Sequence, residues 1–258
     1  WVSFEPAYNY FMYSLWSASG LPPANRTGCH PVRGDYSSPA VAGDSNGNFH
    51  LLIKSYYQSN GSGNRIFYSN FVNGGWSSSQ YIGIGWVPVL YVDHNNKIHT
   101  AWYDNGPPVY RAKEGIGSEW PAPENVFSGM GCPDISLITD GNDLPRLTCV
   151  AYGTVYETSR QPEGWTEAAS VTGNMSEQPN LAKDINGGLH LVWSDFRAGN
   201  WEIYYSTDSG YDCSGYETSL SPIGQAVFAK VEKDQEFCGN HFDGLITLPP
   251  GQPAFEKF

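Results

Sequence analysis

Four carboxylates stand in segments that vary strongly along the chain. They are Asp35, Asp104, Glu177 and Asp195. Hydrolysis of a glycosidic bond requires two carboxyl groups roughly 5–10 Å apart on either side of the bond. We therefore treat these four residues as candidate catalytic groups. Their positions along the chain leave open which two converge.

Aromatic and polar residues accompany the carboxylates in the same segments. Aromatic rings stack on the C–H faces of sugars, while carboxylate, amide and guanidinium groups bind the hydroxyls. Each ring could instead simply fill space at a strand end. The candidate ligand-binding residues are Tyr36, Tyr57, Arg65, Trp86, Tyr103, Asp104, Asp195, Arg197 and Trp201.

No metal-ligand set is expected. His50, His99 and His190 occur once in each of three repeats, which places them too far apart to share an ion. Aspartates such as Asp44 and Asp184 precede Asn-Gly pairs, where Asx side chains typically cap tight turns. We expect no cofactor, although Asp- and Asn-rich turns on an acidic surface could hold Ca²⁺.

These residues sit on an internal repeat. In four segments a proline and a short apolar run end in Asp, and a polar turn and a second strand follow, as in His99-Thr-Ala-Trp102. A third strand comes next, then a Gly-containing turn or an aromatic residue. The starting prolines are 49, 45 and 46 residues apart, at Pro39, Pro88, Pro133 and Pro179. This period in an all-β chain predicts one four-stranded propeller blade per repeat.

The whole chain is expected to form a single all-β domain, a β-propeller over residues 1–258 with four internal blades. A fifth blade would combine strands from both termini, closing the ring and removing exposed edges. Ala226–Val231 and Gly244–Leu248 are the candidate C-terminal strands. A sixth blade follows if the C-terminal segment is more regular than its sequence indicates. The boundaries are 1–38 for the outer strands of the closing blade, 39–83, 84–128, 129–174 and 175–216 for the blades, and 217–258 for the closing strands and C-terminal extension.

The fourth repeat carries a family resemblance. Its segments His190-Leu-Val-Trp-Ser-Asp195, Gly199-Asn-Trp-Glu-Ile-Tyr-Tyr-Ser206 and Ser206-Thr-Asp-Ser-Gly210 resemble the Asp-box (BNR) repeats of sialidase-like β-propellers. The resemblance implies a propeller fold and a function among sialidases, other glycosidases, polysaccharide lyases, lectins and adhesion modules. The Arg-Ile-Pro segment and the Tyr–Glu nucleophile pair of sialidases are not found.

Composition restricts the partners. A formal net charge of −12 argues against nucleic acid, and no apolar run approaches the ~20 residues needed to span a bilayer. The start at Trp1, without an initiator Met or a leader, indicates a processed or trimmed chain. Five cysteines without a C-x-x-C pair favour an oxidising compartment, with disulfides Cys213–Cys238 and Cys132–Cys149. Glycosylation sequons begin at Asn25, Asn60 and Asn174.

The sequence therefore predicts a secreted or cell-surface glycoprotein that binds carbohydrate, as a lectin-like or adhesion propeller. Degenerate repeats, abundant aromatic residues and the missing sialidase signatures favour this interpretation over catalysis. One alternative is a glycoside hydrolase or polysaccharide lyase of sialidase-like fold. Another is a structural surface or matrix domain that self-associates through its C-terminal segment. A glycan or polysaccharide is the expected partner.

Overall fold

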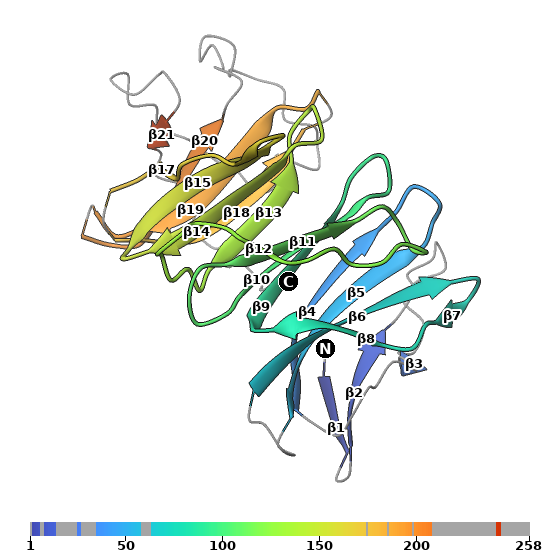
Figure 1. Ribbon diagram of the computed structural model, residues 1–258. Coiled ribbons are helices and arrows are strands. Elements are labelled where there is room, and N and C mark those ends of the chain that lie inside the picture. Colours follow the sequence, from blue (N-terminus) through green and yellow to red (C-terminus); the bar gives the residue numbers. More distant parts are fainter. Residues whose placement is uncertain are drawn as a thin grey trace, which may run out of the picture.

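The computed structural model describes the backbone of residues 2–5, 8–13, 25–26, 35–57, 63–173, 175–184, 186–197, 199–207 and 241–243 (Figure 1). Side chains are described within residues 38–55 and 63–207, apart from residues 174, 185 and 198. Only strands, turns and bends occur in these parts, which confirms the all-β expectation. None of the described elements is a helix long and apolar enough to cross a membrane.

The strands form five antiparallel sheets, in chain order. The first holds β1 (Val2–Glu5), β2 (Tyr8–Tyr13) and β3 (Asn25–Arg26), and the second β4 (Asp35–Gly43), β5 (Phe49–Tyr57), β6 (Gly63–Val72), β7 (Gly75–Trp76) and β8 (Gln80–Ile84). The third holds β9 (Trp86–Val92), β10 (Ile98–Tyr103), β11 (Val109–Lys113) and β12 (Glu124–Asn125). The fourth holds β13 (Ile135–Thr139), β14 (Pro145–Ala151), β15 (Thr154–Gln161), β16 (Gly164–Trp165) and β17 (Ala169–Ser170). The fifth holds β18 (Ser176–Lys183), β19 (Leu189–Asp195), β20 (Glu202–Thr207) and β21 (His241–Asp243).

From the second sheet on, each sheet packs on the next through its first strand, and the first sheet does so through β2. Strand β2 contacts β4, β4 contacts β9, β9 contacts β13, and β13 contacts β18. The sheets thus follow one another as successive twisted layers (Figure 1). We call β4, β9, β13 and β18 the inner strands. The predicted short outer strands are confirmed in the second, third and fourth sheets by β7, β12 and β16. In the fifth sheet the fourth strand, β21, comes instead from the segment that was expected to close the ring.

Ring closure stays a prediction. The expected closing strands, residues 226–231 and 244–248, lie outside the described residues. The described C-terminal strand, β21, pairs with β20 and becomes the fourth strand of the last sheet. It thereby covers an edge that would otherwise expose unpaired backbone groups. The Asp-box residues 208–210 also lie outside the described part of the chain.

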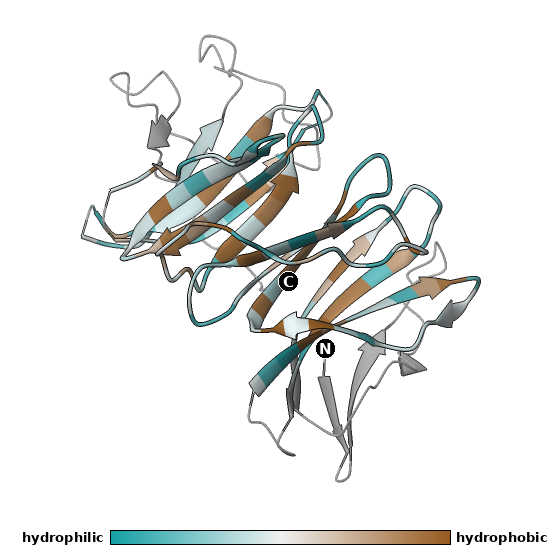
Figure 2. Ribbon diagram, in the orientation of Figure 1, coloured by the Kyte–Doolittle hydropathy of each residue, from teal (hydrophilic) through white to brown (hydrophobic). Residues whose placement is uncertain are grey.

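Hydrophobic and hydrophilic residues alternate along several strands (Figure 2). The apolar side chains form clusters between sheets. One cluster joins the second and third sheets around Leu52, Ile66 and Trp102, and another joins the third and fourth around Tyr110 and Leu147. Full burial of such a side chain contributes about 1.5–3 kcal/mol. Stacking is therefore required, because a single sheet cannot cover both of its own faces.

Trp102 sets the distance between the second and third sheets. A Cβ added at Gly83 would lie 2.4 Å from Trp102 Cζ2, and one added at Gly85 would lie 2.3 Å from Trp102 Cδ1. Both glycines precede inner strand β9 in the sequence. The indole can therefore pack directly against the backbone of β8 and of the segment leading to Trp86.

Three inner strands share a β-bulge close to their start. In each, two residues face a single residue of the following strand, and the first of the two precedes a proline and has positive φ. The φ values are 51° at Ser38, 49° at Val87 and 53° at Gln178. Bulges bend the strand and re-aim side chains. They therefore set the direction of the first residues of β4, β9 and β18.

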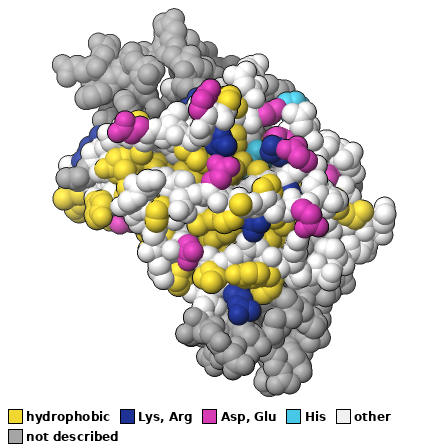
Figure 3. Space-filling model, viewed as in Figure 1, with side chains coloured by type: hydrophobic (Ala, Val, Ile, Leu, Met, Phe, Trp, Pro, Cys, Tyr) yellow, Lys and Arg dark blue, Asp and Glu magenta, His cyan; other side chains and the backbone are white. Residues whose placement is uncertain are grey.

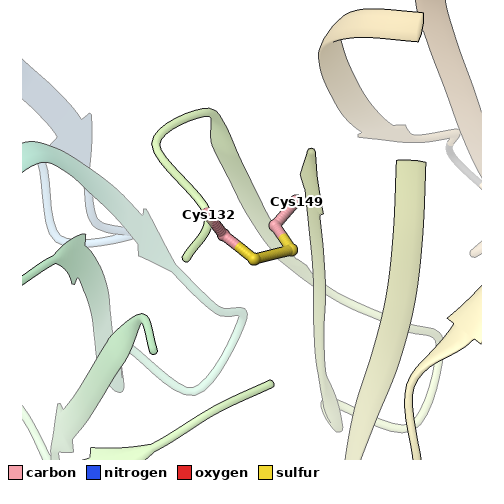
Figure 4. The surroundings of a disulfide bond; sticks show 2 residues. All are labelled: Cys132 and Cys149. Atoms are coloured by element: carbon pink, nitrogen blue, oxygen red, sulfur yellow. A yellow bond between two sulfur atoms is a disulfide. The ribbon is translucent and has the colours of Figure 1, made fainter. Parts of the chain in front are cut away.

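The fourth sheet has a disulfide where the second, third and fifth sheets have a bulge. Strand β13 pairs with β14 in uninterrupted register from Ile135 opposite Cys149. Cys149 stands in the place that Trp102 and Trp193 take opposite their bulges, and it bonds to Cys132 in the preceding loop (Figure 4). This confirms the Cys132–Cys149 prediction. Cys213 and Cys238 lie outside the described residues.

Candidate functional site

The two ends of the sheets differ in character. One end, here the turn face, carries the turns between first and second strands, residues 44–48, 93–97, 140–144 and 184–188. The other, the loop face, carries the connections between second and third strands and the starts of the inner strands. Because the strands alternate in direction, this division repeats in every sheet.

The aspartates of the turn face are structural. In Asp93, Oδ1 accepts hydrogen bonds from the backbone amides of Asn95 (2.9 Å) and Lys97 (2.8 Å). Asp44, Asp140 and Asp184 cap their own turns in the same way. These carboxylates accept hydrogen bonds from backbone amides that the tight turn leaves without a backbone acceptor.

In three of the four turns, the second carboxylate oxygen faces the repeated histidine. His99 Nε2 lies 3.1 Å from Asp93 Oδ2, and its Nδ1 lies 2.7 Å from the hydroxyl of Tyr110. Since the carboxylate only accepts, Nε2 carries the proton and the tyrosine hydroxyl donates to Nδ1. Burial acts to raise the pKa of Asp93, but the bonds from His99 and the turn amides outweigh it and lower that pKa.

The same arrangement recurs in two further sheets. His190 contacts Asp184 and Tyr205, and His50 lies between Asp44 and Tyr68. Burial lowers the pKa of His50 and raises that of Tyr68. In the fourth sheet the set is Asp140, Arg146 and Glu157, joined at 3.3 and 3.0 Å. The repeated histidines therefore connect the first, second and third strands of their own sheets.

Neighbouring turns also bind one another across sheets. Ser45 Oγ donates to Asn96 Oδ1 (2.8 Å), and Asp143 accepts from His94 (2.6 Å) and Asn95 (2.9 Å). These contacts join the second sheet to the third and the third to the fourth. Nothing on the turn face requires a ligand to explain it.

On the loop face, one group of predicted residues meets at the third sheet. Trp86 and Tyr103 are opposite each other on β9 and β10, with ring centroids 6.0 Å apart. Asp104 follows directly and is exposed, and partial desolvation of its carboxylate raises its pKa. Arg65 lies one sheet away, with its guanidinium 5.7 Å from the Tyr81 ring centroid.

A second group surrounds Asp195 at the end of β19. Its side chain has 0% exposure, and Oδ2 accepts from Ser176 Oγ (2.7 Å) and the Arg197 guanidinium (2.6 Å). Oδ1 accepts from the amide of Arg197 (2.8 Å). Burial acts to raise the pKa of Asp195, but the bonds from Arg197 and Ser176 outweigh it and lower the pKa to about 2. Such a carboxylate is suited to positioning Arg197 rather than to exchanging protons.

The arginine lies beside an exposed aromatic pair, Phe196 and Trp201. Their ring centroids are 5.5 Å apart, and the side chains are 37% and 53% exposed. The Arg197 guanidinium lies over the ring of Tyr204, 4.5 Å from its centroid, and this contact helps to hold the guanidinium in place. We call Phe196, Trp201 and Arg197 the aromatic platform.

Sequence reasoning missed two exposed apolar residues next to this platform, Tyr152 and Met175. Both have positive φ, at 53° and 76°. One sequence signal could have identified Tyr152. The pair Tyr152-Gly153 separates two strand segments, and a two-residue hairpin turn usually has Asn or Asp, rather than Tyr, before the Gly.

The remaining predicted residues are placed only in part. Glu177 is exposed near the start of β18, two residues before the bulge proline Pro179. The side chains of Asp35, Tyr36 and Tyr57 lie outside the described residues, as do those of the sequon residues Asn25, Asn60 and Asn174. Within the described side chains, no group of three His, Cys, Asp or Glu residues could hold a metal.

Comparison with known proteins identifies the fold. No protein-family model and no curated protein matches the chain. The GH93 alpha-L-arabinofuranosidase of Fusarium graminearum, solved with arabinobiose, matches at 13% identity and TM-score 0.50, over 67% of this chain and 62% of that one. An arginine-to-alanine triple mutant of AofleA from Arthrobotrys oligospora matches at 11% identity and TM-score 0.50, over 80% of this chain and 64% of that one. Each match spans less than two thirds of the known structure. The chain has a propeller-type fold similar to the folds of these two proteins.

Proposed function

We propose that the chain binds a glycan through the aromatic platform on its loop face. The observation that carries this proposal is the exposed Phe196–Trp201 pair beside an arginine held by a buried carboxylate. Large aromatic side chains usually avoid such exposure, and two together offer a surface that fits the C–H face of a sugar ring.

Polar groups for the sugar hydroxyls stand around the platform. Asn200 Nδ2 donates to Glu202 Oε1 (3.1 Å), and the Tyr204 hydroxyl donates to Glu202 Oε2 (3.2 Å). With Arg197 these groups offer donors and acceptors in fixed directions. Fixed polar groups around an apolar floor are the usual composition of a small-ligand site.

A glycan array followed by calorimetry tests this proposal. Trp201→Ala should weaken the affinity for the best array sugar by about tenfold or more, because an aromatic anchor contributes over 1 kcal/mol. Phe49→Ala is the control, since Phe49 is 37% exposed, as Phe196 is, but begins β5 at the turn face. Equal affinities of wild type and Trp201→Ala, or binding to no sugar, would refute the proposal.

A second candidate function is hydrolysis of a glycosidic bond. It is supported by the fold similarity to an arabinofuranosidase and by Asp104, whose raised pKa suits a general acid. These findings favour the hydrolase alternative over a purely lectin-like role. Asp104 and the exposed Glu177 are the proposed acid and its carboxylate partner. Asp35 remains a candidate for the second carboxylate.

Release of reducing sugar from arabinan, xylan and galactan would test hydrolysis. Asp104→Asn and Glu177→Gln should each lower turnover at least a hundredfold, as removal of a general acid or base typically does. Glu114→Gln is the control, because Glu114 pairs with Lys97 at the turn face. Undiminished turnover in both variants would exclude these two residues from catalysis.

We further propose that the chain works in an oxidising compartment, on the outside of the cell. The support is the buried Cys132–Cys149 disulfide, since such bonds are rare in reducing cytosol. Mass spectrometry of the native protein, alkylated without reduction, should find both thiols protected.

A further inference from the structure

The turn between β14 and β15 holds an exposed tyrosine in a conformation that disfavours it. Ala151 pairs with Thr154, so Tyr152 and Gly153 form a two-residue hairpin turn with φ of 53° and 74°. Turns with two positive φ values favour Asn or Asp at the first position, and bulky residues are outliers there. The Tyr152 side chain is 87% exposed.

Met175 repeats this combination next to the turn. It has φ of 76° and 56% exposure. The amide of Ser176 donates to Gly153 O (2.7 Å), and a Cβ added at Gly153 would lie 3.1 Å from Met175 N. Met175 is thus fixed against the tyrosine turn from the neighbouring sheet.

Met175 also touches the aromatic platform. The amide of Phe196 donates to Met175 O (3.0 Å). The order along the loop face is therefore Tyr152, Met175, Phe196 and Trp201, across the fourth and fifth sheets. In Figure 1 the β14–β15 turn and the β19–β20 loop lie at the same edge, on the left of the view. Figure 3 shows hydrophobic side chains gathered along that edge.

Folding does not account for these two residues. A left-handed conformation costs a non-glycine residue about 1–2 kcal/mol. Neither side chain recovers this cost, because both remain largely in water rather than in the core. Strained residues that persist without a packing role often mark sites of binding. The strain and the exposure here fall on adjacent residues, directly beside a candidate ligand site.

We propose that Tyr152 and Met175 extend the aromatic platform into a binding strip for a linear, neutral oligosaccharide. The inference rests on the proposed glycan binding and adds the class of ligand. An aromatic ring and a polarisable thioether suit further C–H faces of a chain that already contacts Phe196 and Trp201. A neutral chain fits better than a polyanion, because the protein carries a net charge of −12.

Titration calorimetry with ladders of arabino-, xylo- and cello-oligosaccharides, from the monosaccharide to the hexasaccharide, tests the strip. For the ladder that binds, affinity should rise with length in the wild type. Tyr152→Asn should leave the shortest binding sugar unaffected and weaken the hexasaccharide by about fivefold to tenfold. Its melting temperature should not fall, because Asn accepts positive φ more readily than Tyr.

The controls separate this inference from the proposed glycan binding on which it rests. Trp201→Ala should weaken short and long chains alike. If the wild type binds sugars and Trp201→Ala weakens them, but Tyr152→Asn binds every length as the wild type does, the extended strip is refuted and the platform stands. If the wild type binds a sugar of the glycan array but its affinity does not rise with chain length in any ladder, the strip is refuted and the platform stands; if it binds no sugar at all, both proposals fail. Met175→Asn provides a second variant with the same expected length dependence.

Discussion

The buried carboxylate of Asp195 should make both stability and binding depend on pH. We consider the substitution Asp195→Asn, which removes the negative charge and keeps the size. Hydrogen bonds from Arg197 and Ser176 lower the pKa from 3.8 to about 2 in the folded protein. Each pKa unit corresponds to about 1.4 kcal/mol, so the charged form contributes about 2 kcal/mol to the free energy of unfolding.

The pH window follows from the direction of the shift. Because the folded pKa is below the unfolded one, the contribution is complete above about pH 4 and is lost as the pH falls through about 2. Asp195→Asn should therefore cost about 2 kcal/mol at pH 7 and little at pH 2. Breaking the pair also leaves Arg197 without its charge partner, which adds to the cost.

Urea unfolding followed by tryptophan fluorescence at a series of pH values measures this effect. Asp104→Asn is the matched control with the opposite sign. Desolvation raises the pKa of Asp104, so the charged form destabilises the fold and the variant should be at least as stable as wild type at pH 7. A stability loss in Asp195→Asn that is the same at pH 2 and pH 7 would refute the reasoning.

Two further predictions concern the packing beneath the loop face. Gly83→Ala should lower the free energy of unfolding by about 1–3 kcal/mol, because the new Cβ meets Trp102 at 2.4 Å. Gly63→Ala should not lower it, because the space around Gly63 is open. Urea unfolding of both variants measures the difference. Removing the disulfide with Cys132→Ala and Cys149→Ala together should cost about 3 kcal/mol, and reducing agent should lower the melting temperature of wild type more than that of the double variant. An equal effect of the reducing agent on both proteins would show that another bond carries it.

The repeat predicted the fold because its signals are local. A proline, an apolar run and an Asp turn within a few residues determine where each inner strand begins and ends, and Asp93 with Asn95 and Lys97 shows the mechanism. The short outer strands and the Cys132–Cys149 bond follow from the same reasoning. Sequence also placed Trp86 and Tyr103 in one group, and they are in contact.

The site was harder to predict because it depends on burial and on backbone dihedral angles. Asp195 looked like an accessible acid, yet Ser176 from the neighbouring inner strand covers it. The register of β18 and β19 that brings the two together includes a bulge at Gln178 and Pro179. The proline marks the position of the bulge, but it does not report that the resulting register buries Asp195. Tyr152 was missed for a similar reason, since its exposure follows from a two-residue turn that its side chain disfavours.

The position opposite the bulge connects these observations. In the third sheet Trp102 occupies this position, and the inner strand β9 starts with Trp86. In the fifth sheet Trp193 occupies it, and the inner strand β18 starts with Ser176 and Glu177. In the fourth sheet Cys149 occupies it and ties down the preceding loop through Cys132. That sheet therefore has no bulge to aim a side chain from its inner strand. Its contribution to the loop face comes instead from the β14–β15 turn, where Tyr152 stands. In the proposed binding strip, this sheet takes part through Tyr152 of that turn, whose φ is 53°, and not through its inner strand, where the Cys132–Cys149 disulfide takes the place of the bulge.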